Sequence, residues 1–347
     1  MKIEMRHGAG GEAMESLIKD KILSRLSWAD AEVPLSALDD ASVIEDIVFS
    51  TDSYTVKPIF FPGGDIGRLA VSGTVNDVSA VGGLPIAISL GMIVEEGLDM
   101  EDFERVMESI GKTSKEAGVP VITGDTKVVE KGSAEMMFIN TSGIGRRHPL
   151  LDENLRIAEK GGKSRGKWLL DSNIRDGDVI IVSGYIADHG VAVLSGREGY
   201  GFEGDVKSDV APLNGMLGKA LEVGGVVAVK DPTRGGVSNA LNEWSEKSGI
   251  GMIIEESRLP IRKEIDAACE LLGIDPLDLG NEGKYIMAVV PEMAEDVLDA
   301  IRSTPEGRNA KIIGKAVKGS EYVVLQTSVG GKRIVEPPIG DPVPRIC

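Results

Sequence analysis

The sequence predicts an α/β protein of two domains. At 347 residues the chain is long enough for about two domains of ordinary size, each with its own core. Strand-like and helix-like apolar patterns alternate in the first half, and the alternation starts again near residue 174. A charged, glycine-containing stretch between them is poor in strand-forming residues. We therefore expect an N-terminal domain, a linker, a C-terminal domain and a flexible proline-rich tail, over residues 1–148, 149–173, 174–336 and 337–347.

The first domain combines helical and strand patterns in alternation. We expect helices over residues 12–26, 65–83 and 100–118. Two strands joined by a turn are expected over residues 42–56, and single strands over residues 119–123 and 135–145. Gly118 suits the end of the last of these helices, because glycine adopts the left-handed backbone of a helix C-cap. Carboxylates fall at several of the strand ends.

The second domain repeats this layout. Strands are expected over residues 173–184, 224–231, 284–290, 310–317 and 321–328. Helices are expected over residues 236–249 and 261–273. Both domains place an aspartate in a glycine-containing turn directly after an apolar strand, in VPVITGDTK and in GVVAVKDPTRGG.

The composition excludes several classes of protein. Lysine and arginine number 38 against 55 aspartates and glutamates, which gives a net charge of −17 and argues against sequence-independent nucleic-acid binding. No apolar run reaches the roughly 18 residues of a membrane span, and the N-terminus carries no apolar signal region. The only cysteines are Cys269 and Cys347, so a disulfide framework is not indicated and a reducing cytoplasm is expected.

Two glycine-rich stretches were considered as phosphate cradles. The GGKS at 161–164 is rejected, because Ile157 stands where a P-loop needs its first glycine. The HGAGGE at 7–12 offers three glycines directly before a helix whose N-terminus favours anions, namely Gly8, Gly10 and Gly11. A mobile N-terminal loop explains this second stretch equally well.

Carboxylates give a stronger signal than glycines. Asp77 lies in an otherwise apolar helix, and Asp125 and Asp231 directly follow apolar strands; the other candidates are Asp39, Asp40 and Asp52. Each one alone is explained as a cap or turn residue. As a set they favour a site for Mg²⁺ and a nucleotide, because buried carboxylates need partners and magnesium prefers oxygen ligands together with phosphates.

The chain ends in EPPIGDPVPRIC, with a cysteine as the last residue. A terminal thiol has no following chain to hold it in a core, and a thiol oxidises. Four prolines favour an extended backbone before it. Cys269, by contrast, lies on the expected core face of a helix, and three scattered histidines make no zinc site; among them, His189 is expected to be a structural contact.

Several stretches resemble a known superfamily. GTVNDVSAVGGLPIAISLG, VITGDTKV and DPTRGGVSNALNE are similar to signature stretches of the PurM-like ATP enzymes, which include aminoimidazole ribonucleotide synthetase, selenophosphate synthetase and thiamine-monophosphate kinase. LDDAS, GNEGK and the terminal PRIC resemble the HypE branch, the carbamoyl dehydratases of hydrogenase maturation. The likeness covers nearly the whole chain. It departs in the broken glycine run and in a longer stretch at 146–172.

The resemblance implies a PurM-like fold in which N-terminal mixed sheets pair in a homodimer and ATP lies at the cleft. It further implies that a carbamoyltransferase, HypF, loads a carbamoyl group onto Cys347, and that the enzyme dehydrates this S-carboxamide to an S-cyanate with ATP. Phosphorylation makes the amide oxygen a good leaving group. The cyano group then passes to iron on the HypC–HypD scaffold, for a [NiFe]-hydrogenase.

The resemblance also suggests roles for individual residues. Magnesium is assigned to Asp40, Asp77 and Asp125. Cys347 carries the group, Lys127 stabilises charge on the carboxamide oxygen or phosphate, and Glu282 takes the N–H proton. Nucleotide contacts are assigned to Gly8, Gly10, Gly11, Asp52, Asn76, Asp231, Arg234 and Asn281. As ordinary alternatives, Lys127 is a surface lysine and Glu282 a turn residue.

Two other functions remain open at this point. Another PurM-like enzyme, such as a small-molecule kinase or an amide-activating ligase, would share the aspartates but has no need of a terminal thiol. A non-catalytic scaffold whose thiol binds metal or a partner would not turn over ATP, and the set of aspartates argues against it.

Overall fold

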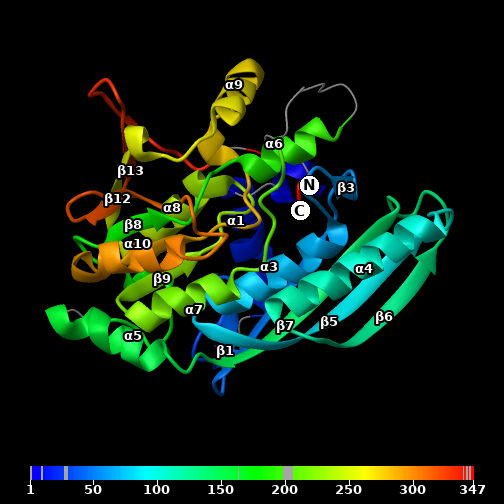
Figure 1. Cartoon of the computed structure of the whole chain (residues 1–347), viewed down its shortest axis with the longest axis horizontal. Helices are drawn as coiled ribbons and strands as arrows, with labels where there is room; N and C mark the ends of the chain where they lie inside the picture. Colours follow the sequence, from blue (N-terminus) through cyan, green and yellow to red (C-terminus); the bar gives the residue numbers. More distant parts are fainter. Residues whose placement is uncertain are drawn as a thin grey trace.

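The computed structural model describes residues 2–8, 11–26, 30–162, 164–197, 206–338, 340, 343 and 345–347, without the side chains of residues 5, 6, 11 and 12. Two sheets with their helices lie next to each other, one built from each half of the chain (Figure 1). This arrangement confirms the predicted α/β class with two domains. In the part of the chain that the structure describes, no helix has both the length and the apolar character to cross a bilayer.

The first sheet has the strand order β1-β2-β7-β5-β6, with only the β5–β6 pair parallel. Its strands are β1 (Ser42–Ile44), β2 (Ile47–Tyr54), β5 (Gly83–Glu95), β6 (Val121–Val129) and β7 (Met137–Arg147). A short hairpin lies beside it, with strands β3 (Phe60–Phe61) and β4 (Gly64–Asp65). The helices of this half are α1 (Gly11–Leu17), which continues through a π-helical turn (Ile18–Leu23) into α2 (Ser24–Leu26), α3 (Ile66–Ala80) and α4 (Met100–Ala117).

In the part of the chain that the structure describes, helices α3 and α4 lie along one face of the first sheet (Figure 1). Helix α3 is buried along nearly its whole length against this face, and the Asp65 carboxylate caps it by accepting hydrogen bonds from the backbone of Gly67 and Arg68 at 2.8 and 3.0 Å. The other face carries exposed apolar side chains, among them Ile47, Phe49 and Ile93. A sheet face with several exposed apolar side chains is typical of a protein–protein interface.

The second sheet has the order β14-β13-β10-β12-β8-β11-β9. Its strands are β8 (Val179–Val182), β9 (Val226–Lys230), β10 (Gly251–Glu255), β11 (Ile286–Val289), β12 (Lys311–Val317), β13 (Val323–Gln326) and β14 (Lys332–Ile334). Helices α7 (Asn214–Val223) and α10 (Ala294–Arg302) share one hydrophobic cluster with this sheet, and α8 (Gly236–Ser248) shares another, so β9 and β11 are buried on both faces. The remaining helices are α5 (Leu151–Ala158), α6 (Asp188–Ser195) and α9 (Lys263–Leu272).

The predicted elements are confirmed at each position where a helix or strand was expected, including the Gly118 cap of α4 with φ 69°. Strand β5 was not predicted, although it is the central partner of both β6 and β7. Its sequence contains Pro85, which cannot donate to a ladder and argues locally against a strand. The structure accommodates Pro85 at an irregularity in the pairing with β7. Helix α6 agrees with the helix start expected at His189, whereas helices α7 and α10 and strands β10 and β14 were not individually foreseen.

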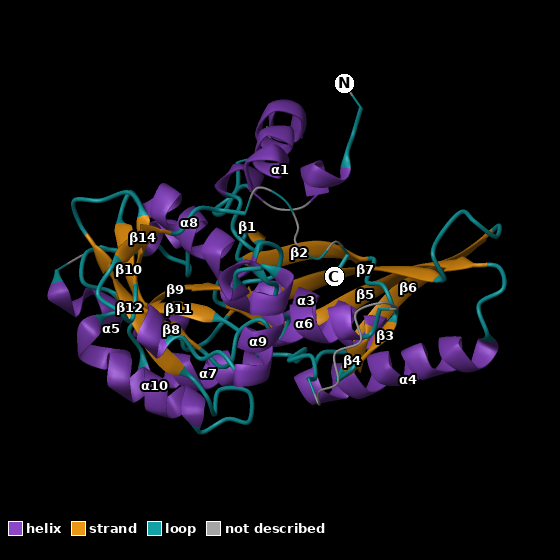
Figure 2. Cartoon of the chain, turned by 90° about the horizontal axis from the view of Figure 1, so that it is seen from above, coloured by secondary structure: helices purple, strands orange, loops and turns teal. Residues whose placement is uncertain are grey.

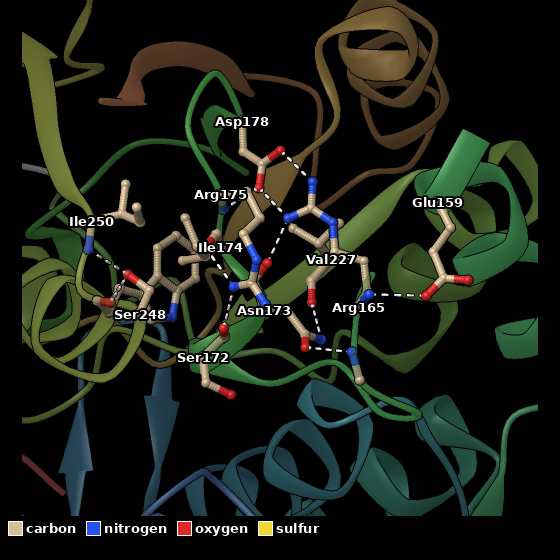
Figure 3. A network of polar contacts seen from close by, with 12 residues as sticks. Glu159, Arg165, Ser172, Asn173, Ile174, Arg175, Asp178, Val227, Ser248 and Ile250 are labelled. Carbon is tan, nitrogen blue, oxygen red and sulfur yellow. Dashed lines mark hydrogen bonds and ion pairs between the residues drawn. The ribbon is translucent and has the colours of Figure 1, made fainter. Parts of the chain in front are cut away.

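The charged stretch that was expected to be a linker is folded onto the second domain (Figure 3). The Arg165 guanidinium donates to both carboxylate oxygens of Asp178 at 2.7 and 2.8 Å, and both side chains are almost completely shielded from solvent. The Asn173 amide donates to the carbonyls of Trp168 and Val227 at 2.7 and 2.9 Å. These contacts anchor the stretch to β8 and β9.

Candidate functional site

Four carboxylates converge where the two sheets meet. Asp77 lies on α3, Asp52 on β2, and Asp231 directly after β9; Glu282 precedes β11. Burial, followed by the negative charges of Asp231, Asp52 and Asp40, raises the pKa of Asp77 well above its usual range. Of the two Asp77 oxygens, one accepts a hydrogen bond from the Ser50 hydroxyl at 2.7 Å. The strand face and the helix thus bring together charges that repel one another.

Glu282 and Asp231 belong to the same electrostatic cluster. Burial, together with Asp231 and Asp52, raises the pKa of Glu282 well above that of an exposed glutamate, and Asp231 is shifted in the same direction by burial and neighbouring carboxylates. The Glu282 Oε1 atom is buried and has no hydrogen-bond partner. A buried oxygen without a partner indicates room for a ligand or cation, because such groups are normally satisfied.

Arg234 adds a positive charge beside these carboxylates. It sits in the turn between β9 and α8, where Gly235 and Gly236 have φ values of 77° and 60°. A Cβ at Gly236 would come within 2.4 Å of the Leu277 carbonyl, so the turn requires glycine there. The charge at Cys347, and then Asp52, Glu282 and Asp77, raise the pKa of the Arg234 guanidinium. Arg234 therefore lies between the cluster and the chain terminus.

Asp40 lies at the edge of the cluster in an ion network. Lys230 donates to Asp40 at 2.9 Å and also contacts Asp171 at 3.2 Å and Glu243 at 3.1 Å. Burial raises the pKa of Asp40, whereas Lys230 opposes the shift. Its charge is thus already balanced within the protein, which makes Asp40 a weaker candidate for a metal ligand than Asp77.

Asp125 and Lys127 are on the opposite face of the first sheet. They form an exposed ion pair on β6 at 2.8 Å. The register pairs Asp125 with Gly91, Gly91 with Asn140, and Asn140 with Ser53, so all four share one face. Asp52, one residue before Ser53, faces α3. Within one subunit, Asp125 and Lys127 are therefore not brought together with Asp77.

The two asparagines assigned to nucleotide hold the protein backbone. The Asn76 amide donates to the Ala211 carbonyl at 3.1 Å and accepts from the Leu213 amide at 2.7 Å. Asn281 accepts from the Ala187 amide at 2.8 Å and donates to the carbonyls of Pro232 and Leu279 at 3.2 and 3.0 Å. Both side chains position loops around the site.

Two of the three N-terminal glycines, Gly8 and Gly11, lie in the described part of the chain. Gly8 ends a short 3₁₀ turn and has open space around it, and Gly11 begins α1. Gly10 lies outside the described residues. Lys19, in the helical segment that follows, contacts Glu246 of α8 at 3.0 Å, which links the N-terminal helix to the helix that begins beside Arg234.

The chain terminus lies within the fold, near α3 and α6 (Figure 2). The Cys347 carbonyl accepts from the amide and hydroxyl of Thr55 at 3.1 and 3.2 Å, and Ile346 and Val343 are buried. Cys347 is half-buried, and neither cysteine forms a disulfide. No sequence pattern indicates Thr55 as a partner of the terminus.

The carboxylates fit a hard divalent cation. Asp52, Asp77 and Asp231 provide oxygen donors, their pKa values are raised mainly by burial, and Arg234 is too little positive charge to balance them. Magnesium takes oxygen ligands of this kind together with phosphates. Across the residues described, no group of three or more histidine, cysteine, aspartate or glutamate side chains is placed to hold a metal ion by itself.

The family comparisons match both domains. A family model for AIR synthase related proteins matches residues 38–147 with its N-terminal domain and residues 175–326 with its C-terminal domain. A putative hydrogenase expression/formation protein of Methanocaldococcus jannaschii is 50% identical, with 100% of each chain covered. The carbamoyl dehydratase HypE of Rhizobium leguminosarum bv. viciae is 44% identical, covering 100% of this chain and 95% of the relative.

Solved structures give the same relationship. A HypE–HypF complex contains a chain 41% identical with a TM-score of 0.84, covering 93% of this chain and 100% of the other. HypE in complex with ATP is 42% identical with a TM-score of 0.79, and both chains are covered completely. The chain belongs to the HypE family of carbamoyl dehydratases, within the AIR synthase related proteins, and is an enzyme of hydrogenase maturation.

Proposed function

We propose that this enzyme uses ATP and Mg²⁺ to dehydrate an S-carboxamide carried on Cys347 to an S-cyanate, which supplies cyanide ligands for a [NiFe]-hydrogenase iron centre. One observation carries the proposal: the docked terminus brings Cys347 beside Arg234 at the carboxylate cluster. The relative solved with ATP supports the choice of nucleotide. A terminal thiol that rests in such a cluster is what a carrier needs and a small-molecule kinase does not.

The cluster supports a magnesium–nucleotide site. Asp52, Asp77 and Asp231 would hold the ion, whose charge would offset the carboxylates and the phosphates. Arg234, at a glycine turn that opens α8, suits a phosphate oxygen because guanidinium groups and helix N-termini both favour phosphate.

The residues around Cys347 support the dehydration chemistry. The carboxamide oxygen attacks the γ-phosphorus of ATP, the bond to ADP breaks, and a proton leaves the nitrogen. Loss of phosphate with the second N–H proton then gives the S–C≡N group, so the amide oxygen ends in phosphate. Glu282 flanks Arg234 and has a raised pKa, which makes its carboxylate a stronger base than an exposed glutamate.

We extend the proposal to a homodimer in which Asp125 and Lys127 serve the site of the other subunit. The face of the first sheet that carries Asp125 and Lys127 also exposes Ile47, Phe49 and Ile93. Covering these apolar side chains with a second sheet is favourable because it removes them from water. Because both residues point away from Asp77 in their own subunit, a second copy is the direct way to bring them to a cluster.

The proposed reaction needs partners on either side of it. A HypF-type carbamoyltransferase would load Cys347, in keeping with the related HypE–HypF complex, and a HypC–HypD scaffold would accept the cyanide. A carrier thiol of this kind belongs in a reducing cytoplasm, where it stays available for loading.

The mass of the C-terminal peptide tests the proposed function. After incubation with the carbamoyltransferase, carbamoyl phosphate and ATP, the peptide ending in Cys347 should first gain a carbamoyl group and then lose the mass of one water. Cys347→Ala should remain unmodified while keeping its fold and its ATP binding. A loaded peptide that never loses water with Mg²⁺ and ATP present would contradict the dehydratase assignment.

A further inference from the structure

Two main-chain hydrogen bonds hold the last three residues. The Lys57 amide donates to the Arg345 carbonyl at 3.2 Å, and the Thr55 amide donates to the Cys347 carbonyl at 3.1 Å. Arg345 has a φ of 61°, so the segment is not a regular strand, and the Ile346 side chain is turned into the protein. Main-chain bonds of this type fix the path of a peptide but do not read its side chains.

The side chain of Ile346 fills a closed socket. It is 2% exposed and belongs to a hydrophobic cluster built from residues of both domains. A Cβ built at Gly280 would lie 2.4 Å from the Cδ1 atom of Ile346, so the socket exists only because position 280 carries no side chain. The socket therefore distinguishes the register that places Ile346 inside it from registers shifted by one residue.

His189 contacts the backbone of the same residue. Its Nε2 atom lies 2.7 Å from the Ile346 carbonyl, and its Nδ1 atom lies 2.8 Å from the Ser208 hydroxyl. The carbonyl can only accept, so Nε2 carries the proton and donates. Ser208 already accepts from the Val210 amide at 3.1 Å, which leaves its hydroxyl proton for Nδ1.

The imidazole ring of His189 is enclosed by the protein at this contact. It is completely buried at the start of α6, and the Phe61 ring packs against it edge-on at 5.4 Å. Burial lowers the pKa of His189, which agrees with a neutral ring that has one donor and one acceptor. Without the tail, the buried N–H would lose its partner, so the contact favours the docked state.

We propose that His189 is a positioning residue for the carrier tail, which fixes the register at Ile346 so that the Cys347 thiol stops beside Arg234. Ser208 sets the tautomer of the ring, and Gly280 leaves space for the isoleucine. The hydrogen bond and the socket at Ile346 add specificity to the main-chain bonds from Thr55 and Lys57, and all of these contacts are non-covalent, so the tail can be released. Weak holding is required because, under the proposed function on which the catalytic arm rests, the tail must also visit a loading enzyme.

Thiol accessibility tests this role without any nucleotide. His189→Phe keeps an aromatic ring but removes the donor, whereas His189→Gln returns an N–H donor near the position of Nε2. Alkylation of Cys347 by iodoacetamide, followed by peptide mass, should become faster by roughly fivefold in His189→Phe and return toward wild type in His189→Gln. The peptide readout separates Cys347 from buried Cys269.

The catalytic arm separates positioning from general damage. In His189→Phe, loading of Cys347 by the carbamoyltransferase should be unchanged or faster, while conversion to S-cyanate slows by roughly the same factor of five. A structural defect would lower both rates together with the melting temperature. Failure of cyanate formation in the wild type would instead count against the proposed function and would leave the alkylation result standing.

A second pair of variants tests the proposal independently, so that it can be judged even if His189→Phe does not fold. Gly280→Ala should fill the socket and speed alkylation, whereas Gly215→Ala, on α7 with nothing within 4 Å of its Cβ, should behave as wild type. Wild-type alkylation in both folded His189→Phe and folded Gly280→Ala would overturn the proposal.

Discussion

Individual carboxylates in this protein are kept in an unfavourable environment. Asp77, Asp231 and Glu282 have pKa values raised by burial and by one another, with Arg234 as the nearby positive charge. Removing a charge from water is costly unless an opposite charge compensates it. The cluster is therefore expected to gain stability from a bound cation, and that expectation can be tested one residue at a time.

Replacing Asp77 should separate folding from function. Asp77→Asn removes one of the repelling charges, so the unliganded variant should melt at the same temperature as wild type or higher, while turnover falls by at least about 100-fold if the carboxylate holds magnesium. Differential scanning fluorimetry should show that Mg²⁺ and ATP together stabilise the wild type but not the variant. The exposed Asp296→Asn on α10 is the matched control. Wild-type turnover in Asp77→Asn would remove this residue from the metal site.

The raised pKa values also determine how stability changes with pH. A carboxyl group whose pKa is higher in the folded than in the unfolded state binds more protons when folded. Its contribution is fully present below the unfolded pKa and is lost as the pH rises through the folded pKa. The melting temperature of the unliganded protein should thus fall as the pH rises above about 4, where carboxyl groups of the unfolded chain ionise, and the slope should be shallower in Asp77→Asn. A melting temperature that rises steadily over this pH range would contradict the cluster's charge state.

Among the elements, the stretch between the domains shows how a charged sequence becomes structural. The Arg165–Asp178 pair closes it onto β8, and Arg165 also donates to the Asn173 carbonyl (Figure 3). A buried pair contributes little net stability when intact but leaves a costly lone charge when broken. The segment is therefore fixed relative to strand β9, whose end carries Asp231.

Breaking that pair should destabilise the whole protein. Arg165→Ala leaves Asp178 buried without its partner and should lower the free energy of unfolding by about 3–5 kcal/mol in urea denaturation. Arg156→Ala, which breaks an exposed pair with Glu153 in the same stretch, should cost less than about 1 kcal/mol. If the two variants lost equal stability, the buried pair would not be what anchors the segment.

At the scale of the whole molecule, one face of the first sheet is open to solvent in the single chain. It combines exposed apolar residues with the Asp125–Lys127 pair, on the face opposite Asp77. The proposed homodimer explains both, since it would cover the first and bring the second to a site.

Subunit mixing tests this arrangement directly. Lys127→Ala and Cys347→Ala should each be inactive as homodimers. Co-expressed with different affinity tags, they should form a mixed dimer that regains up to about half of wild-type activity, because one site would combine an intact Cys347 with an intact Lys127. If both residues acted within the same subunit, the mixed dimer would stay inactive. A monomer in analytical ultracentrifugation would exclude the arrangement altogether.

The sequence alone determined the order of most helices and strands, the two-domain α/β class and the carrier cysteine at the end. These features are local: apolar periodicity reports the buried face of one element, and glycine, proline and terminal residues report backbone limits at one position. Strand β5 was missed because Pro85 argues locally against a strand that only its partners β6 and β7 stabilise.

Tertiary structure decided which of the predicted residues meet. Asp77 and Asp231 come together, whereas Asp125 faces away, because strand order and register are set by contacts between segments far apart in the chain. The same long-range packing made Asn76 a support for the backbone and placed the terminus against Thr55. Side-chain type indicated which residues can bind metal or phosphate. The pairing of distant strands decided on which face of the sheet each charged side chain lies.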